Sequence, residues 1–249
     1  MDLKNGELVL LLSEKNSFLV EVGSGKLHTQ DGIVDLKTLV KKKIGDEIKS
    51  HLGRKFKIVK PNLLDVLNKR MKRLPQIIMT KDAAAIIANT GVMPRSLVVD
   101  AGTGSGFLAI FLANYLPVGK VVTYEKNKKF ARVANENIKK SGLPNLKLKQ
   151  KDITKGIDEK NVDLITLDMN HPEQVIKHAH RALVAGGWVV VYSPFIEQVA
   201  AVVKELKKKN FRSIKIIENI VREWQVEKAS RPKTIGLMHT GFLTFARKI

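Results

Sequence analysis

The sequence predicts an α/β fold, in which a mostly parallel sheet is covered by helices on both faces and preceded by a small β domain. Two observations carry this prediction. From residue 96 onward, apolar strand-like runs alternate with helix-compatible segments, which is the order that produces parallel sheets. Before residue 60, short strand-like runs follow one another closely with turn residues between them, as in small antiparallel sheets or barrels. We therefore divide the chain into residues 1–60 and residues 61–249.

The first part of the chain contains four strand-like runs, at residues 8–12, 17–22, 26–29 and 33–36. Phe18 and Phe56 are its only aromatic residues, so it lacks the interleaved aromatics that bind single-stranded nucleic acid. We expect an auxiliary domain that grips a partner or supports oligomerisation. Pro61 then opens a helical stretch with a basic end, and the domain boundary should fall between residues 58 and 75.

The second part alternates strands and helices after a short extended segment at residues 75–79 and a helix at 81–89. The predicted strands cover residues 97–99, 120–124, 146–149, 162–167, 188–192, 212–220 and 242–246, and the predicted helices cover residues 107–116, 128–140, 172–183 and 196–209. Ligands of such sheets bind beyond the carboxyl ends of the parallel strands. That rule selects the polar residues directly after the strands as candidates for function.

The net charge of +20, from 44 Lys and Arg against 24 Asp and Glu, indicates a polyanionic partner. Residues 1–60 carry 12 basic and 8 acidic residues and the rest carry 32 and 16, so the charge belongs to a surface rather than a tail. A lysine-rich bias without a ligand is the alternative.

The absence of cysteine excludes disulfides, thiolate zinc sites and a thiol nucleophile, and no metal-binding motif is present. Without an apolar run long enough to span a bilayer or a signal-peptide pattern, we expect a cytoplasmic protein.

Residues 98–107, VVDAGTGSGF, join an apolar strand to an apolar helix through a glycine-rich turn. Glycine permits the tight turn, and its missing side chain lets a ligand approach the backbone. Gly102, Gly104 and Gly106 follow Asp100 at every second residue, which differs from the dinucleotide spacing G-x-G-x-x-G. The pattern favours S-adenosylmethionine over a nicotinamide cofactor. The glycine turn of some other α/β protein is the alternative.

Two carboxylates follow the next two strands. Glu125 comes 19 residues after Gly106 and can accept both hydroxyl hydrogens of a ribose, with a surface glutamate at a helix start as the alternative. Asp152 follows the third strand and could accept the exocyclic amine of an adenine. A plain N-terminal cap is the alternative for Asp152, because aspartate caps helices well.

Three further residues are candidates on the substrate side. Asp168 ends the fourth strand and is not obviously needed as a cap, because other residues precede the helix that Pro172 begins. Tyr192 ends the fifth strand and could line the same pocket, with a half-buried structural tyrosine as the alternative. His239 is a candidate for substrate binding, although a structural hydrogen bond is the simpler interpretation.

These motifs resemble those of class I methyltransferases, and more narrowly those of the tRNA adenine-N1 methyltransferase family. The resemblance covers nearly the whole chain and includes KLHTQDGIVDL, RLPQIIMTKDAAAII, VVDAGTGSGF, VVTYEK, KDIT, LDMNHPE, GGWVVVYSP and the closing HTGFLTFARK. The glycine motif is general to class I methyltransferases. The Q-I-I-x-x-K-D segment and the H-T-G-F-L ending are narrower, so they carry the specific assignment.

The resemblance implies a Rossmann-like class I methyltransferase sheet and methylation of N1 of an adenosine in the tRNA T-loop, at position 58 and in archaeal members sometimes also at 57. It also implies a homotetramer. The candidate set for holding S-adenosylmethionine comprises Gln76, Asp100, Gly102, Gly104, Ser105, Gly106, Phe107, Glu125 and Asp152. By the same match, Asp168 would be the catalytic acid that positions the target adenine, and Tyr192 would line the base pocket.

Two departures from the family pattern fall on the substrate side. Members commonly read D-L-P-x-P where this chain has Asp168-Met169-Asn170-His171-Pro172, and tyrosine often follows Q-I-I where this chain has Met79. Two alternatives therefore stay open: a non-catalytic tRNA-binding subunit on the same fold, and a methyltransferase that acts on a protein carboxylate or a small molecule. The glycine turn with Glu125 disfavours the first, and the net charge of +20 disfavours a small molecule.

Overall fold

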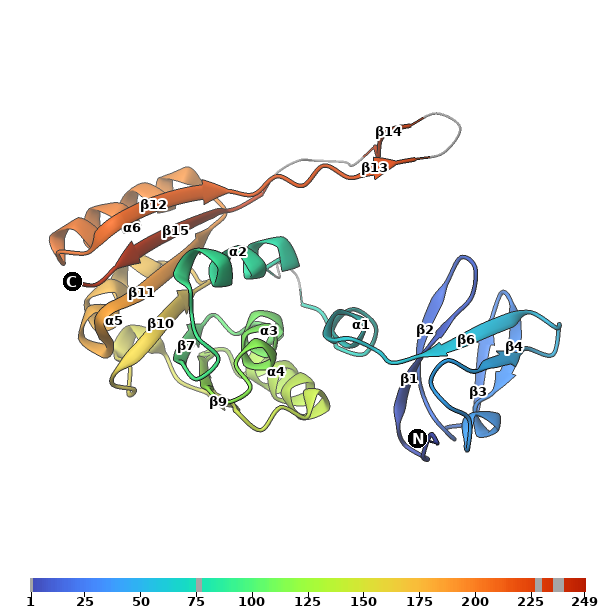
Figure 1. The fold of residues 1–249 in the computed structure, drawn as a ribbon. Helices are drawn as coiled ribbons and strands as arrows, with labels where there is room; N and C mark the ends of the chain where they lie inside the picture. The colour runs from blue at the N-terminus through green and yellow to red at the C-terminus, as the bar shows by residue number, and fades with distance from the viewer. Residues whose placement is uncertain (1, 75–77, 227–229, 235–239) are drawn as a thin grey trace. The chain divides into compact units, whose positions relative to one another are not determined.

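The computed structural model describes residues 2–74, 78–226, 230–234 and 240–249 (Figure 1). The chain forms two compact units, Met1–Met71 and Lys72–Ile249. The division falls later than residue 60 because helix α1 (Leu63–Lys69) packs with the strands of the first unit. Lys69 Nζ donates a hydrogen bond to the Ser17 carbonyl at 2.8 Å, and Arg70 lies 3.7 Å from Glu21.

The first unit is the predicted small β domain. Its antiparallel sheet has the strand order β2-β1-β6-β5 and consists of β1 (Leu8–Leu12), β2 (Ser17–Glu21), β5 (Glu47–Lys49) and β6 (Lys55–Val59). A separate hairpin of β3 (Lys26–Thr29) and β4 (Gly32–Asp35) leads into the 3-10 helix η1 (Leu36–Leu39). The domain closes on its own core, in which Val9, Leu11, Phe56 and Ile58 are fully buried.

The second unit is built on a seven-stranded sheet with the order β12-β15-β11-β10-β7-β8-β9. Its parallel strands are β7 (Leu97–Ala101), β8 (Lys120–Tyr124), β9 (Leu146–Lys149), β10 (Val162–Leu167) and β11 (Leu183–Ser193). β15 (Phe242–Arg247) runs antiparallel between β11 and β12 (Arg212–Glu218). The strand order reverses direction at β7, so ligands are expected at the carboxyl ends of β7 and its two neighbours.

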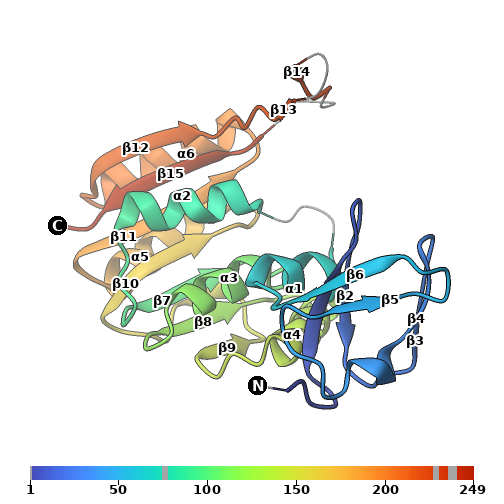
Figure 2. The same cartoon turned by 45° about the vertical axis from the view of Figure 1, so that its right-hand side comes forward.

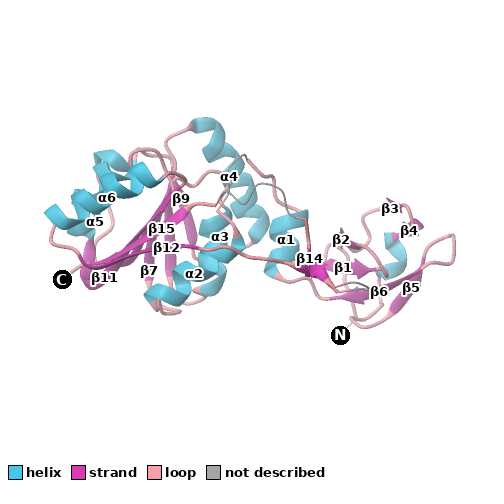
Figure 3. Cartoon of the chain, turned by 90° about the horizontal axis from the view of Figure 1, so that it is seen from above, coloured by secondary structure: helices cyan, strands magenta, loops and turns pink. Residues whose placement is uncertain are grey.

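Helices cover both faces of this sheet, as predicted (Figure 3). One face carries α2 (Thr80–Thr90), α3 (Phe107–Tyr115) and α4 (Lys128–Ser141), and the other carries α5 (Ile176–Ala182) and α6 (Ile196–Lys208). Two 3-10 helices, η2 (Ile153–Lys155) and η3 (Pro172–Val175), follow β9 and β10. The predicted helix at 172–183 therefore begins as η3, and its N-cap residue His171 has the left-handed φ of 57°.

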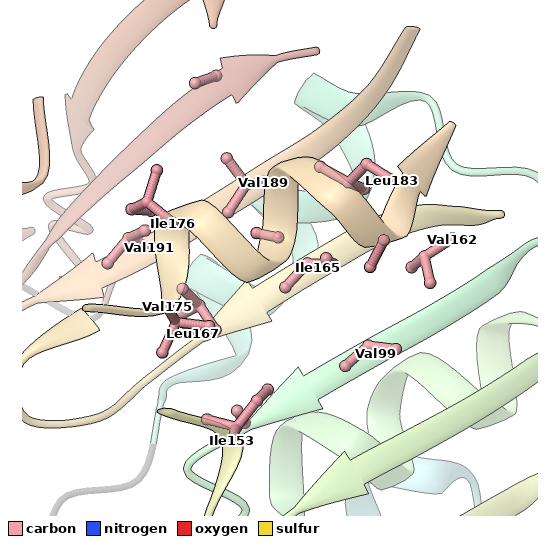
Figure 4. Close-up of a cluster of buried hydrophobic side chains, with 14 of the residues drawn as sticks. Val99, Ile153, Val162, Ile165, Leu167, Val175, Ile176, Leu183, Val189 and Val191 are labelled. Carbon is pink, nitrogen blue, oxygen red and sulfur yellow. The ribbon is translucent and has the colours of Figure 1, made fainter. Parts of the chain in front are cut away.

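Buried aliphatic side chains fix the strands that carry the candidate residues. Ile165 and Leu167 of β10 and Val189 of β11 pack against α5, where Ile176 is fully buried (Figure 4).

The chain also forms a short hairpin between β12 and β15, made of β13 (Trp224–Gln225) and β14 (Arg231–Pro232), which the sequence did not predict. Figure 2 shows this hairpin projecting beyond the ends of β12 and β15. Among the described residues, no helix is long and apolar enough to cross a membrane.

Candidate functional site

The glycine turn lies between the end of β7 and the start of α3, at the centre of the sheet. Gly102, Gly104 and Gly106 have φ values of 83°, 55° and 87°, in the region that favours glycine. A Cβ on Gly102 would lie 1.7 Å from the Asp168 carbonyl oxygen, so β10 approaches the turn too closely for any side chain. The turn therefore brings the ends of β7 and β10 together, and places the amino end of α3 beside them.

Asp100 is committed to the sheet. It is 2% exposed, and its two carboxylate oxygens accept hydrogen bonds from Thr123 of β8 at 2.6 Å and Thr166 of β10 at 2.7 Å. Burial raises the pKa of Asp100, while the two hydroxyl donors oppose that rise. Its carboxylate thus links β7 to both neighbouring strands. Asp100 is among the residues predicted to hold the cofactor, and in the structure both of its carboxylate oxygens are hydrogen-bonded within the sheet.

Glu125 lies against the glycine turn. Its Oε2 accepts a hydrogen bond from the Gly104 N–H at 3.0 Å, and its Oε1 accepts one from the Asn127 N–H at 2.8 Å. The side chain is 7% exposed, so these two bonds hold it in one position. Glu125 therefore stands next to the turn, as its predicted role at the ribose requires.

Asp152 is the N-cap of η2. Its Oδ1 accepts hydrogen bonds from the backbone N–H and the hydroxyl of Thr154, at 3.0 and 2.8 Å, and these bonds lower its pKa. The capping alternative is thus realised in the structure, through one of the two carboxylate oxygens. Behind it, Lys149 binds Asp158 at 3.0 Å and Glu159 at 2.6 Å, which ties the segment after η2 to the end of β9.

Asp168 directly follows β10 and differs from the other carboxylates. Its backbone N–H donates to the Ala101 carbonyl at 2.8 Å, but within the described part of the chain its carboxylate accepts no hydrogen bond. Burial, and secondly the negative charge of Asp100, raise the pKa of Asp168 to about 7. A half-buried carboxyl with a raised pKa, at a ligand-binding edge and without a hydrogen-bond donor among the described residues, is a candidate for direct action on a substrate.

Tyr192 lies near Asp168 at the end of β11. Burial raises its pKa, with smaller contributions from the charges of Asp82 and Asp168. A Cβ on Gly241 would lie 2.2 Å from the ring carbon Cζ, so the tyrosine packs directly on the chain that enters β15. The structure therefore brings Tyr192 and Asp168 to the same side of the sheet, as the sequence reasoning expected.

A buried ion pair that the sequence reasoning did not assign lies next to this side. Asp82 is 1% exposed and is bound by Lys81 Nζ, 2.8 Å from its Oδ2, and by Asn219 Nδ2 at 3.1 Å. Lys81 also donates to the Thr240 hydroxyl at 2.8 Å. The start of α2 is thus joined to both chain segments that flank the β13–β14 hairpin. The adjacent pair Lys81-Asp82 was the available signal, but its partners lie more than a hundred residues away.

The remaining candidates divide into two groups. Ser105 is 1% exposed and its hydroxyl has no hydrogen-bond partner among the described residues. Phe107 begins α3, and the Arg73 guanidinium lies 5.5 Å from its ring centroid. Gln76 and His239 lie outside the described residues. Among the described residues, no three His, Asp or Glu side chains are grouped so that they could hold a metal ion.

In sequence, the chain is similar to tRNA methyltransferases. Residues 61–235 match the family described as "tRNA methyltransferase complex GCD14 subunit". The chain is 39% identical to a Methanocaldococcus jannaschii protein named tRNA (adenine(57)-N(1)/adenine(58)-N(1))-methyltransferase TrmI, over 96% of this chain and 94% of that one. It is 29% identical to the Thermus thermophilus protein named tRNA (adenine(58)-N(1))-methyltransferase TrmI, over 98% and 97% of the two chains.

Two solved structures share the whole fold. A Thermotoga maritima protein described as an SAM-dependent O-methyltransferase superposes with a TM-score of 0.90 at 36% identity, covering 99% of this chain and 94% of that one. The tRNA (m1A58) methyltransferase TrmI of Aquifex aeolicus superposes with a TM-score of 0.84 at 25% identity, covering 100% and 99%. The predicted class I methyltransferase architecture is confirmed. The two descriptions name different acceptor atoms, an oxygen for the Thermotoga protein and a nitrogen for the Aquifex protein.

Proposed function

The chain belongs to the tRNA methyltransferase family, and we propose that it transfers a methyl group from S-adenosylmethionine to tRNA. The proposed acceptor is N1 of adenosine 58, with N1 of adenosine 57 as a second target. The observation that carries the proposal is the half-buried carboxyl of Asp168 beside the glycine turn, which accepts no hydrogen bond from any described residue. A carboxylate so placed can accept a hydrogen bond from the exocyclic amine of an adenine.

The residues around the turn fit the methyl donor. The turn has no side chain at three positions, Glu125 stands beside it, and the buried Ser105 hydroxyl has no partner in the part of the chain that the structure describes. Glu125 would hold the ribose, Asp152 the adenine amine and the turn the remaining part of the donor. When bound, S-adenosylmethionine supplies an electrophilic methyl group on a sulfonium centre.

On the acceptor side, Asp168 has to be ionised to act. Its carboxylate would accept the hydrogen bond of the adenine amine, which increases electron density at N1 and orients that nitrogen towards the methyl group. The methylated base carries a positive charge, and the ionised Asp168 stabilises it. Tyr192, fixed on Gly241, would line the pocket for a base turned out of its stack.

Charge and exposed apolar surface support the proposed partners. The net charge of +20 favours a phosphate-rich substrate such as tRNA. We assign the protein to the cytoplasm, where tRNA is abundant, and to a homo-oligomer, a tetramer by family resemblance. Apolar side chains on β12 and the hairpin after it are exposed and suited to contact another copy; they are Ile216, Ile220, Val221, Trp224 and Val226.

The test is methylation of unmodified tRNA transcripts with labelled donor, followed by mapping of reverse-transcription stops, because N1-methyladenine blocks base pairing. Wild-type transcript should give a stop at position 58, and a transcript with guanosine at both 57 and 58 should give none. Absence of label from tRNA would refute the proposal.

The O-methyltransferase described for the Thermotoga relative is a second candidate, because its chain is 36% identical. Label in tRNA without a reverse-transcription stop would favour a ribose oxygen as acceptor. Tight binding of tRNA with no calorimetric signal for S-adenosylmethionine would favour the non-catalytic subunit instead.

A further inference from the structure

A buried amide connects α4, the glycine turn and the first residues of the second unit. Asn137 of α4 is 0% exposed. Its Nδ2 donates hydrogen bonds to the carbonyls of Ser105 and Lys72, both at 2.8 Å, and its Oδ1 accepts one from the Lys72 N–H at 3.0 Å. All hydrogen-bonding groups of the amide are therefore used, and all are directed at backbone.

Lys72 and Arg73, which we call the strap, are held at two further points. Lys72 Nζ lies 2.7 Å from the carboxylate of Glu136, the residue before Asn137. The Arg73 guanidinium lies 5.5 Å from the ring centroid of Phe107, the first residue of α3. The strap therefore runs from α4 to the amino end of α3, beside the glycine turn.

The turn also rests directly on α4. A Cβ on Gly106 would lie 3.8 Å from the backbone of Ala134, which is fully buried and lies three residues before Asn137 on the same helix face. Small side chains thus let α4 approach the turn, and Asn137 then fixes the orientation of the Ser105 peptide. The N–H groups that follow at the start of α3 owe their direction to that peptide.

We propose that Asn137 is a positioning residue for the methyl donor. Its hydrogen bond to the Ser105 carbonyl sets the shape of the glycine turn. Its hydrogen bonds to Lys72 hold the strap in place beside the start of α3. The inference rests on the proposed function, because it takes the turn to be the donor site. Because the hydrogen bonds of the Asn137 side chain all go to backbone groups, its effect on the donor is an indirect one through that backbone.

The chain provides a matched control at the opposite end of α3. Asn145 Nδ2 also donates to two carbonyls, those of Ala113 at 2.9 Å and Leu116 at 2.7 Å. Asn145→Asp also places a carboxylate against two carbonyl oxygens, at a half-buried position, whereas Asn137 is fully buried. Both substitutions should lower the thermal midpoint of unfolding, but only Asn137 lies at the glycine turn.

The experiment is calorimetric titration of the full-length variants with S-adenosylmethionine, well below their unfolding midpoints. Asn137→Asp should raise the Kd by about tenfold or more, and Asn145→Asp should leave it within about twofold of wild type. Should Asn137→Asp not fold, Asn137→Ser, which removes the amide without adding charge, is expected to raise the Kd in the same direction. An unchanged Kd in the folded Asn137 variant, or an equal rise in the Asn145 variant, would overturn the inference. Absence of binding by wild type would instead refute the proposed function, and the inference with it.

Discussion

The donor and acceptor sides of the site differ in how their carboxylates are satisfied. On the donor side Asp100 accepts hydrogen bonds from two threonines, Glu125 from two backbone N–H groups, and Asp152 from Thr154. On the acceptor side, Asp168 has no such donor among the described residues, and its pKa is raised to about 7. The three donor-side carboxylates are therefore satisfied within the protein, while Asp168 accepts no hydrogen bond in the described part of the chain and is open to one from a substrate.

That difference has a cost in stability. Between the unfolded pKa of 3.8 and the folded pKa of about 7, the folded chain binds the Asp168 proton more tightly than the unfolded chain does. The free energy of unfolding therefore falls as pH rises through this window, and above about pH 7 the full cost of a few kcal/mol is present. Burial raises the pKa of Asp100 on the donor side as well, but there two threonine hydroxyls oppose the rise, whereas no hydrogen bond from the described residues opposes it at Asp168.

The largest expected effect comes from Asp168→Asn, which removes the charge and keeps the shape. Turnover on tRNA should fall by about a hundredfold to a thousandfold, because the amide cannot stabilise the positive charge of the methylated base. The Kd for S-adenosylmethionine should rise only a few fold, because the variant loses the attraction between the Asp168 carboxylate and the sulfonium cation but no contact at the glycine turn. Denaturant unfolding at pH 8 should show a variant more stable than wild type by a few kcal/mol. Near-normal turnover of the variant would show that the Asp168 carboxylate does not act on the substrate.

Gly102→Ala should break both sides at once. The new Cβ would lie 1.7 Å from the Asp168 carbonyl oxygen at a residue with φ of 83°, so β10 and the turn have to separate. We expect the free energy of unfolding to fall by about 3 kcal/mol or more, with loss of donor binding.

Gly142→Ala is the control for that substitution, since Gly142 has φ of 67° and open space around its Cβ position. It should cost about 1 kcal/mol from backbone strain alone. Equal losses in the two variants, measured by urea unfolding, would mean that the close approach of β10 is not what requires glycine at position 102.

Local chemistry was predictable from sequence, whereas contacts between distant segments were not. The glycine spacing after an apolar run placed the turn, and the strand-end rule placed Glu125 and Asp168 at one edge of the sheet. Asn137 could not be found in this way, because a polar residue on an amphipathic helix gives no sign that it faces Ser105 and Lys72. Asp152 shows the intermediate case: the sequence allowed both a cap and a ligand contact, and the structure realises the cap without using the second oxygen.

The pH dependence of catalysis should report the ionisation of Asp168 on the acceptor side. At low donor concentration, kcat/KM should fall about tenfold per unit below pH 7 and level off above it, since Asp168 has to be ionised and its pKa is about 7. Saturating donor should move this midpoint to lower pH, because a nearby sulfonium cation favours the carboxylate. Asp168→Asn should lose the dependence. A midpoint that stays in that variant would assign the titration to another group.

The smallest expected effect concerns Asp152, where capping and donor binding can be separated by two substitutions. Asp152→Asn keeps an oxygen for the Thr154 N–H but replaces the second carboxylate oxygen with an N–H donor, which would face the amine of the adenine. It should raise the Kd for S-adenosylmethionine by about threefold to tenfold with little change in stability. Asp152→Ala should show the same rise and also lose about 1 kcal/mol of unfolding free energy, because the cap is gone. Asp35→Ala removes the equivalent cap of η1 and should leave the Kd unchanged. If Asp152→Asn binds the donor as wild type does, the carboxylate acts as a helix cap alone, and the donor side depends on Glu125 and the glycine turn.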